Sequence, residues 1–159
     1  MRMARAVTGA YLAEQRFFAG LGADALAFLA DCSSERRFAA DEVTIRHGDR
    51  ARNFYLVCMG RIAREVPAIQ GPALVMESLG AGAILGWSWL IPPYQWSFQA
   101  RAEELTETLE FDGARILARC EADPAFGYAV LKRFSTLMSE RLMHARRKMI
   151  AEWNPPGFG

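Results

Sequence analysis

Residues 38–62 read FAADEVTIRHGDRARNFYLVCMGRI, and this stretch has the pattern of short β-strands separated by tight turns. Apolar and polar residues alternate over residues 43–47, as they do in a strand with one buried face. Gly48-Asp49 is a turn signal, and the β-branched and aromatic run over residues 53–58 predicts a second strand, which a glycine closes. The stretch therefore predicts a sheet whose strands are short and joined by glycine turns.

The same pattern continues beyond this stretch and makes residues 35–111 a strand-rich zone. Further short apolar or alternating runs lie at Arg61–Val66, Ala73–Met76, Phe98–Ala102 and Leu105–Phe111. Glycines at positions 60, 80, 82 and 86 interrupt the zone at close intervals. Many short strands with glycine turns predict a sandwich or a jelly-roll barrel.

Helical patterns flank the strand-rich zone on both sides. Residues 8–34 are predicted to be helical, because the sequence ADALAFLAD at residues 23–31 places its apolar residues on one face. On the other side, residues 112–152 are predicted to form two helices. We interpret the whole chain, residues 1–159, as a single domain.

Two aspartates mark the starts of the C-terminal helices. Asp112 has the position of an N-cap for a short helix over residues 113–120. Asp123-Pro124 combines an N-cap with proline at the first helical position. The long helix that begins there is expected to run to about Glu152, and Pro155-Pro156 ends it.

One face of the long helix is apolar over its whole predicted length. It carries Phe126, Val130, Phe134, Leu137, Met138, Leu142, Ala145 and Met149. At about 1.5 Å per residue, such a helix extends beyond a small barrel, and its distal part needs another surface to cover it. A second copy of the chain meets this need, so we predict a two-fold homodimer formed through the last six of these residues.

The composition is that of an ordinary globular protein. The 159 residues are 52% hydrophobic and 23% charged, with a formal net charge of +1, so nothing points to nucleic acid or to a membrane. The N-terminal segment has arginines but no apolar stretch after them. We therefore expect no secretion signal and a cytoplasmic location.

The sequence contains no motif that indicates a metal site, a cofactor site or a catalytic site. The three cysteines, at positions 32, 58 and 120, have no CxxC spacing and predict reduced thiols. No GxSxG, HExxH or Walker pattern occurs. We therefore expect no cofactor and no enzymatic activity.

Together, these elements resemble the cyclic-nucleotide-binding domain of catabolite-activator-type (Crp/Fnr-like) regulators over about residues 15–150. The likeness rests on the order of the elements, on the G-x-G-x-x-x-G spacing of Gly80, Gly82 and Gly86, and on residues 38–62. It implies an α+β, mainly β fold. This fold is a double-stranded β-helix or jelly roll, the cyclic-nucleotide-binding β-roll, with N-terminal helices and a long C-terminal helix.

Regulators of this family carry a helix-turn-helix domain after the long helix. Here the sequence stops a few residues after Pro156, and a recognition helix with its support needs more chain than that. We therefore expect no direct sequence-specific DNA binding.

The resemblance also implies a phosphate-binding cassette at residues 86–102, GWSWLIPPYQWSFQARA. In the family, a glutamate after the glycine holds the ribose hydroxyl, and an arginine further along pairs with the cyclic phosphate and precedes a serine or threonine. Aligned without gaps, Trp87 stands at the glutamate position and Trp96 at the arginine position, and only Ser97 keeps its type. A phosphate buried without a cation is strongly disfavoured. We therefore predict that cyclic AMP and cyclic GMP do not bind in the usual mode.

Several functions stay open for this cassette. The leading hypothesis is a stand-alone, dimeric sensory or regulatory domain with an altered effector pocket, whose state an unidentified protein partner reads. The candidate pocket residues are Gly86, Trp87, Trp89, Trp96, Ser97 and Arg101. The alternatives are a structural or protein-interaction module whose tryptophans fill the pocket, and binding of a nucleotide or another small molecule through Arg101. A further alternative is a haem sensor with His144 as the ligand.

Overall fold

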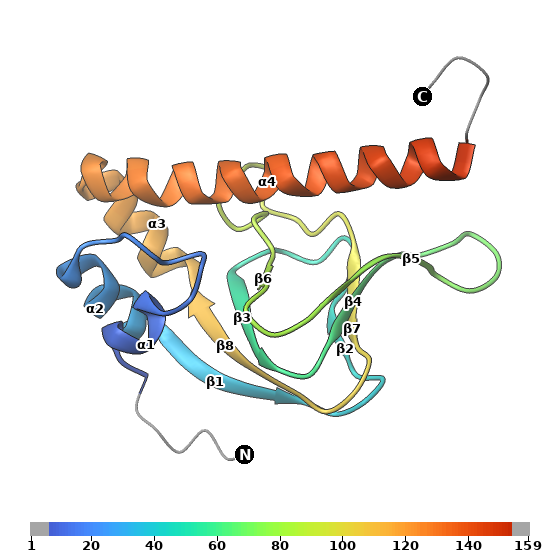
Figure 1. Cartoon of the computed structure of the whole chain (residues 1–159), viewed down its shortest axis with the longest axis horizontal. Helices are drawn as coiled ribbons and strands as arrows, with labels where there is room; N and C mark the ends of the chain where they lie inside the picture. Colours follow the sequence, from blue (N-terminus) through green and yellow to red (C-terminus); the bar gives the residue numbers. More distant parts are fainter. Residues whose placement is uncertain (1–6, 154–159) are drawn as a thin grey trace.

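The computed structural model describes residues 7–153, which form a β-roll with helices on either side (Figure 1). The strands are β1 (Ser33–Phe38), β2 (Val43–Ile45), β3 (Asn53–Met59), β4 (Ile62–Val66), β5 (Leu74–Leu79), β6 (Ile84–Leu85), β7 (Gln99–Ala102) and β8 (Thr106–Asp112). The helices are α1 (Gly9–Ala13), α2 (Ala23–Asp31), α3 (Gly113–Ala122) and α4 (Pro124–Trp153).

The strands form two antiparallel sheets, and their order in each sheet differs from their order along the chain. One sheet has the order β1-β8-β3-β6 and the other the order β2-β7-β4-β5. The chain therefore passes back and forth between the sheets, as in a jelly roll. The predicted mainly β fold with a long C-terminal helix is confirmed.

The centre of the core lies where β3 pairs with β8. Phe54 stands opposite Phe111 in the register, and their rings stack with centroids 4.5 Å apart. Leu56 and Leu109 face each other two residues away, and neither has exposed surface. The β-branched and aromatic run over residues 53–58 therefore forms a strand because it supplies the buried side chains of the roll.

Both predicted caps are present at the C-terminal helices. The side chain of Asp112 accepts a hydrogen bond from the backbone N–H of Arg115 at 3.2 Å, where α3 begins. The side chain of Asp123 accepts one from the backbone N–H of Phe126 at 3.2 Å, where α4 begins. These bonds satisfy N–H groups that have no partner within the helix. The predicted stop of α4 at Pro155-Pro156 lies outside the described residues, as do residues 1–6 of the N-terminal segment.

The N-terminal zone is less helical than predicted. Residues 8–34 were expected to be helical, but α1 and α2 are short and turns separate them. Ser33 and Ser34 already belong to β1, because they pair with Phe111 and Glu110 of β8. Pairing with an available sheet edge decides the structure there over the local helical pattern.

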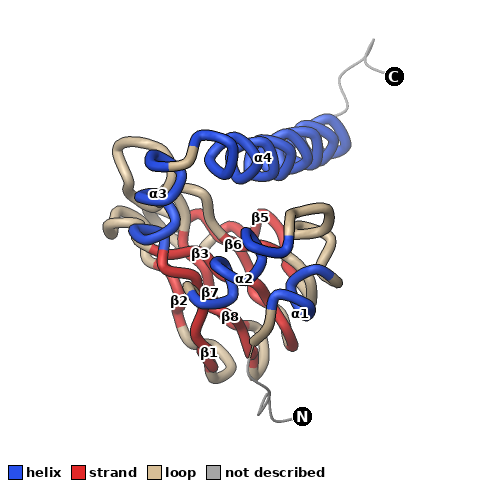
Figure 2. The backbone as a smooth tube through the Cα atoms, turned by 90° about the vertical axis from the view of Figure 1, so that its left-hand side faces the viewer, coloured by secondary structure: helices blue, strands red, loops and turns tan. Residues whose placement is uncertain are grey.

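The long helix α4 lies on one side of the roll and is anchored there by aromatic packing (Figure 1 and Figure 2). Phe134 has no exposed surface. Its ring lies 4.9 Å from that of Phe17, and 5.2 Å from those of Phe54 and Trp89. Phe134, predicted for the dimer face, therefore belongs to the core of its own chain, because the roll and the N-terminal segment already surround it.

Beyond Phe134 the apolar face of α4 becomes progressively exposed. Leu137 and Met138 are half-buried against the core, and Ala145 is exposed. Leu142 is 70% exposed and Met149 is 58% exposed. The described part of α4 therefore has a buried half and an exposed half that still carries apolar side chains.

We expect Phe134→Ala to lower the free energy of unfolding by about 3–5 kcal/mol, because a fully buried aromatic ring is lost. Met143→Ala is the matched control on the same helix, because Met143 is exposed and lies away from the face that carries Leu142 and Met149, and it is expected to change that free energy by at most about 0.5 kcal/mol. Urea denaturation of dilute protein measures both values. Equal losses in the two variants would show that α4 is not anchored at Phe134.

Candidate functional site

The cassette segment Gly86–Ala102 begins directly after β6 and ends with β7, and its central contact joins Gly86 to Trp96. Gly86 has φ +98° and is buried. A Cβ placed on Gly86 would lie 2.5 Å from Cζ3 of Trp96, so the indole rests directly on bare backbone. Trp96 is only 6% exposed, and its ring meets that of Phe98 edge-on at 5.7 Å. Trp96, which the sequence analysis aligned with the family's arginine, is thus part of the packed interior.

The other two cassette tryptophans lie in different surroundings. The half-buried ring of Trp87 lies beneath the guanidinium of Arg141 from α4, with Cζ 5.6 Å from the ring centroid. Trp89 is 2% exposed and stacks on Phe54 at 5.2 Å. Its Nε1 has no hydrogen-bond partner among the described residues. Trp87 therefore faces α4, whereas Trp89 belongs to the aromatic core.

Ser97 and Arg101 do not point to a shared pocket with these indoles. Ser97 is exposed. Arg101 Nε lies 3.0 Å from Oε1 of Glu65 on β4, and Gln99 donates to the same oxygen at 3.0 Å. Of the six predicted residues, the structure brings Gly86 and Trp96 into contact. Trp87 directly follows Gly86 in the sequence. The structure puts Trp89, Ser97 and Arg101 elsewhere.

A buried cluster of charges lies between the roll and α4, and the sequence analysis did not single it out. Oε1 of Glu77 on β5 lies 3.0 Å from Nε of Arg64 on β4 and 3.1 Å from Nε of Arg141 on α4. These side chains are 13%, 10% and 9% exposed, respectively. Both contacts are ion pairs without the alignment of hydrogen bonds. One carboxylate is thus shared by two guanidinium groups.

Burial has a clear electrostatic effect on both arginines. It is the main cause that lowers the pKa of Arg141 to about 10, and the nearby charge of Arg64 lowers it further. Burial also lowers the pKa of Arg64, and the charge of Glu77 opposes this change. Arg141 donates a hydrogen bond to the carbonyl oxygen of Ile84, but its Nη1 has no partner among the described residues. The cluster therefore has more positive charge than its carboxylate compensates.

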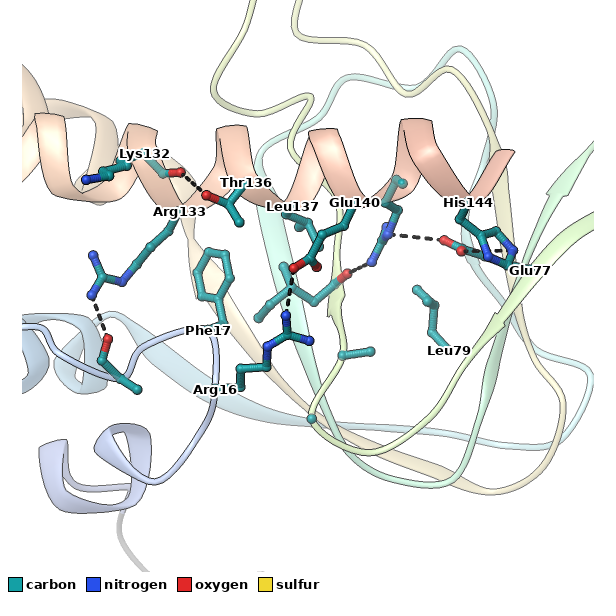
Figure 3. A pocket seen from close by; sticks show the side chains of 15 residues that line it. Arg16, Phe17, Glu77, Leu79, Lys132, Arg133, Thr136, Leu137, Glu140 and His144 are labelled. Atoms are coloured by element: carbon teal, nitrogen blue, oxygen red, sulfur yellow. Dashed lines mark hydrogen bonds and ion pairs between the residues drawn. The ribbon is translucent and has the colours of Figure 1, made fainter. Parts of the chain in front are cut away.

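His144 extends the cluster along α4 toward solvent. Its Nε2 lies 4.0 Å from Oε2 of Glu77, and its side chain is 52% exposed (Figure 3). The imidazole of His144 therefore lies beside the carboxylate of Glu77 and borders the cluster.

The spacing of residues along β4 and α4 contained a sequence signal for this cluster. Arg64 lies two residues after Ile62, so a period-two strand places both on the same inward face. Arg141 follows Leu137 by four residues and Phe134 by seven, and it therefore shares the apolar face of α4. Arg141 is buried although it is charged, because its position on the helix turns it toward the roll.

No metal site emerges within residues 7–153. No three His, Cys, Asp or Glu side chains gather there closely enough to hold a metal ion. Cys32, Cys58 and Cys120 are free thiols, and burial raises the pKa of Cys120 to about 11. No helix in this part of the chain combines the length and the apolar character that crossing a bilayer requires.

Gly86→Ala tests whether Trp96 occupies the cassette in solution. Gly82→Ala is the control, because Gly82 has a similar φ of +86° but no atom within 4 Å of an added Cβ. We expect the control to lose about 1–2 kcal/mol of unfolding free energy from the left-handed backbone alone. Gly86→Ala is expected to lose about 1–3 kcal/mol more, because the indole must move.

The same two glycine variants in a Trp96→Ala background test whether the indole causes the extra loss of unfolding free energy. If it does, the extra loss of Gly86→Ala disappears in that background. Chemical denaturation measures all of these variants. Equal losses for Gly86→Ala and Gly82→Ala in the wild-type background would place Trp96 outside the cassette.

Comparison with known proteins gives one family and several solved structures of the same fold. A sequence model of the cyclic nucleotide-binding domain matches residues 35–123. A search of curated proteins found no match. A protein from Geobacter metallireducens GS-15, named for cyclic nucleotide binding, is 27% identical with a TM-score of 0.78. That alignment covers 86% of this chain and 98% of the Geobacter chain.

Two further structures share the fold at lower identity. A cyclic nucleotide-binding domain from Methylobacillus flagellatus KT is 17% identical with a TM-score of 0.76, over 89% of this chain and 79% of its own. The catabolite activator protein of Thermus thermophilus is 24% identical with a TM-score of 0.68, over 84% of this chain and 61% of its own. The family match covers more than half of the sequence and includes β1 to α3, and the chain therefore belongs to the cyclic nucleotide-binding domain family.

Proposed function

We propose that this chain is a dimeric sensory or regulatory domain of Crp/Fnr type, without enzymatic activity, that does not hold cyclic AMP or cyclic GMP in the usual mode of its family. The observation that carries this proposal is the position of Trp96. It stands where the family has its phosphate-binding arginine, it is 6% exposed, and it rests on the bare backbone of Gly86.

A cyclic phosphate would find no available cation in this cassette. Arg101, the one arginine of the segment, is paired with Glu65. Arg64 and Arg141 lie over the rings of Phe98 and Trp87, but both share Glu77. Desolvation of the phosphate would therefore not be offset by a guanidinium that forms two parallel hydrogen bonds with it. The glutamate position is occupied by Trp87, whose indole cannot accept the hydrogen bonds of a ribose hydroxyl.

The long helix is the element through which such a domain would signal. Its first half is fixed to the roll at Phe134, whereas its second half carries the exposed apolar residues Leu142 and Met149. A second copy of α4 would cover that apolar surface across a two-fold axis. A shift of α4 on the roll would then change the relation between the two protomers, which a partner protein can recognise.

A structural or protein-interaction module is the second candidate. The packing of Trp96 against Gly86 and Phe98 favours it, because indoles that fill a cavity stabilise a fold without any ligand. This candidate shares the dimer with the first one but has no effector.

We expect calorimetric titration of the wild-type chain with cyclic AMP or cyclic GMP to show no binding at about 1 mM. In the double variant Trp87→Glu/Trp96→Arg, which restores the two polar groups of the family, we expect measurable binding of at least one nucleotide. Ser97→Arg is the control, because it adds a charge at an exposed neighbour. Micromolar binding by the wild-type chain would overturn the proposal.

The dimer is tested by sedimentation velocity. We expect the wild-type chain to sediment as a dimer and the variant Leu142→Asp/Met149→Asp as a monomer, because two carboxylates would be buried at the interface. Thr136→Asp/Met143→Asp adds the same charge at two exposed positions, also seven residues apart, on another face of α4 and should leave the dimer intact. A monomeric wild-type chain, or a dimer that survives in the first variant, contradicts this part of the proposal.

A further inference from the structure

A groove of about 600 Å³ lies between α4, the segment that follows α1, and the β5–β6 region (Figure 3). Arg16 and Phe17 line one side of it, and Glu77 and Leu79 line another. A cavity of this volume accommodates a small organic molecule. The tryptophans of the cassette are not among its lining residues, so the groove is a different site from the cassette.

Permanent cations outnumber carboxylates in this groove. The cations are Arg16, Lys132, Arg133 and Arg141, and the carboxylates are Glu77 and Glu140. Glu140 is paired with Arg16 at 2.7 Å, and Glu77 with Arg64 and Arg141. Lys132 and Arg133 form no ion pair with any described residue. The groove therefore presents uncompensated positive charge, which attracts anions.

Excess positive charge also lies beside Arg141. This guanidinium is 9% exposed, shares its carboxylate with Arg64, and has an Nη1 atom without a partner among the described residues. Burial, followed by the charge of Arg64, lowers the pKa of Arg141 to about 10. An additional negative charge nearby would stabilise both guanidinium groups.

Arg16 is an exposed second cation on the opposite side. Its side chain is 87% exposed, and its ion pair with Glu140 lies at the surface, where such pairs contribute little stability. Figure 3 shows Arg16 and Glu140 pointing toward each other across the groove. Arg16 is therefore able to leave Glu140 for a ligand at low cost.

Apart from Thr136 and His144, the remaining lining is apolar, and it favours a ligand with an apolar part over a bare ion. Phe17 and Leu137 are half-buried in the wall, and Leu79 is buried. A ligand that is wholly charged would leave these surfaces without contacts, whereas one with an apolar body would cover them.

We propose that this groove binds a small organic anion, with its carboxylate or phosphate group between Arg16 and Arg141 and its apolar body on Phe17 and Leu137. The ligand would contact α4, the β5–β6 region and the N-terminal segment at once, and its binding energy would bias the position of α4 on the roll. This inference rests on the proposed sensory role and names the class of effector, but it does not depend on the cassette.

The test is a calorimetric titration of the full chain with three probes of similar shape: phenyl phosphate, phenylacetate and the uncharged phenylacetamide. We expect at least one anion to bind and the amide not to bind, and the two anions distinguish a phosphate from a carboxylate group. Tryptophan fluorescence gives an independent readout, because Trp87 lies under Arg141. We expect the anion to change the emission, and Trp87→Phe to abolish most of that change.

Arg16→Gln is the decisive variant, since its exposure makes a folding defect implausible. We expect it to weaken binding of the anion about tenfold. Arg147→Gln removes an exposed cation of α4 outside the groove and should leave affinity unchanged. Absence of binding by both anions at about 10 mM, or equal affinity of Arg16→Gln and wild type, overturns the inference. Neither result alters the outcome of the cyclic-nucleotide titrations, so the two proposals fail separately.

Discussion

The contact between the indole of Trp96 and the bare backbone of Gly86 is the constraint on which the proposed function depends. Gly86 provides a surface without a side chain, which in this fold lies at the start of the ligand cassette, and here an aromatic ring occupies it. Because Trp96 is buried with Phe98, this ring is part of the core and cannot leave without exposing apolar surface. A ligand that enters the cassette would therefore compete with the protein's own packing.

The second constraint is the way α4 is held. Aromatic packing around Phe134 fixes the helix to the roll through apolar contacts. The ion pair between Glu77 and Arg141 fixes the helix at a second point. Removing water from these charges is costly, so this second attachment adds less stability than its short distances suggest. It is sensitive to any other charge that arrives nearby, and it lies at the edge of the anion-binding groove. The helix is thus held firmly at Phe134 and by a charge-sensitive ion pair at Arg141. Such a helix is suited to change its position when a ligand occupies the groove.

Local patterns predicted much of the fold, and contacts over long distances in the sequence decided the rest. Asp112 and Asp123 were predicted as caps because capping is a local interaction. The strand at Ser33 was missed because it depends on β8, which is distant in the sequence. In the site, the alignment predicts that Trp87 and Trp96 replace polar residues of the family, and this stays a prediction, whereas it did not predict that Trp89 lies apart from them in the aromatic core. The buried Arg64 and Arg141 were overlooked because charge normally indicates exposure.

The most direct test is a crystal structure of the chain grown with a large excess of cyclic AMP. We expect density for the indole of Trp96 against Gly86 and no nucleotide between the roll and α4. A cyclic AMP molecule seated in the roll, with its phosphate neutralised by any side chain of this protein and with Trp96 displaced, would contradict the central claim.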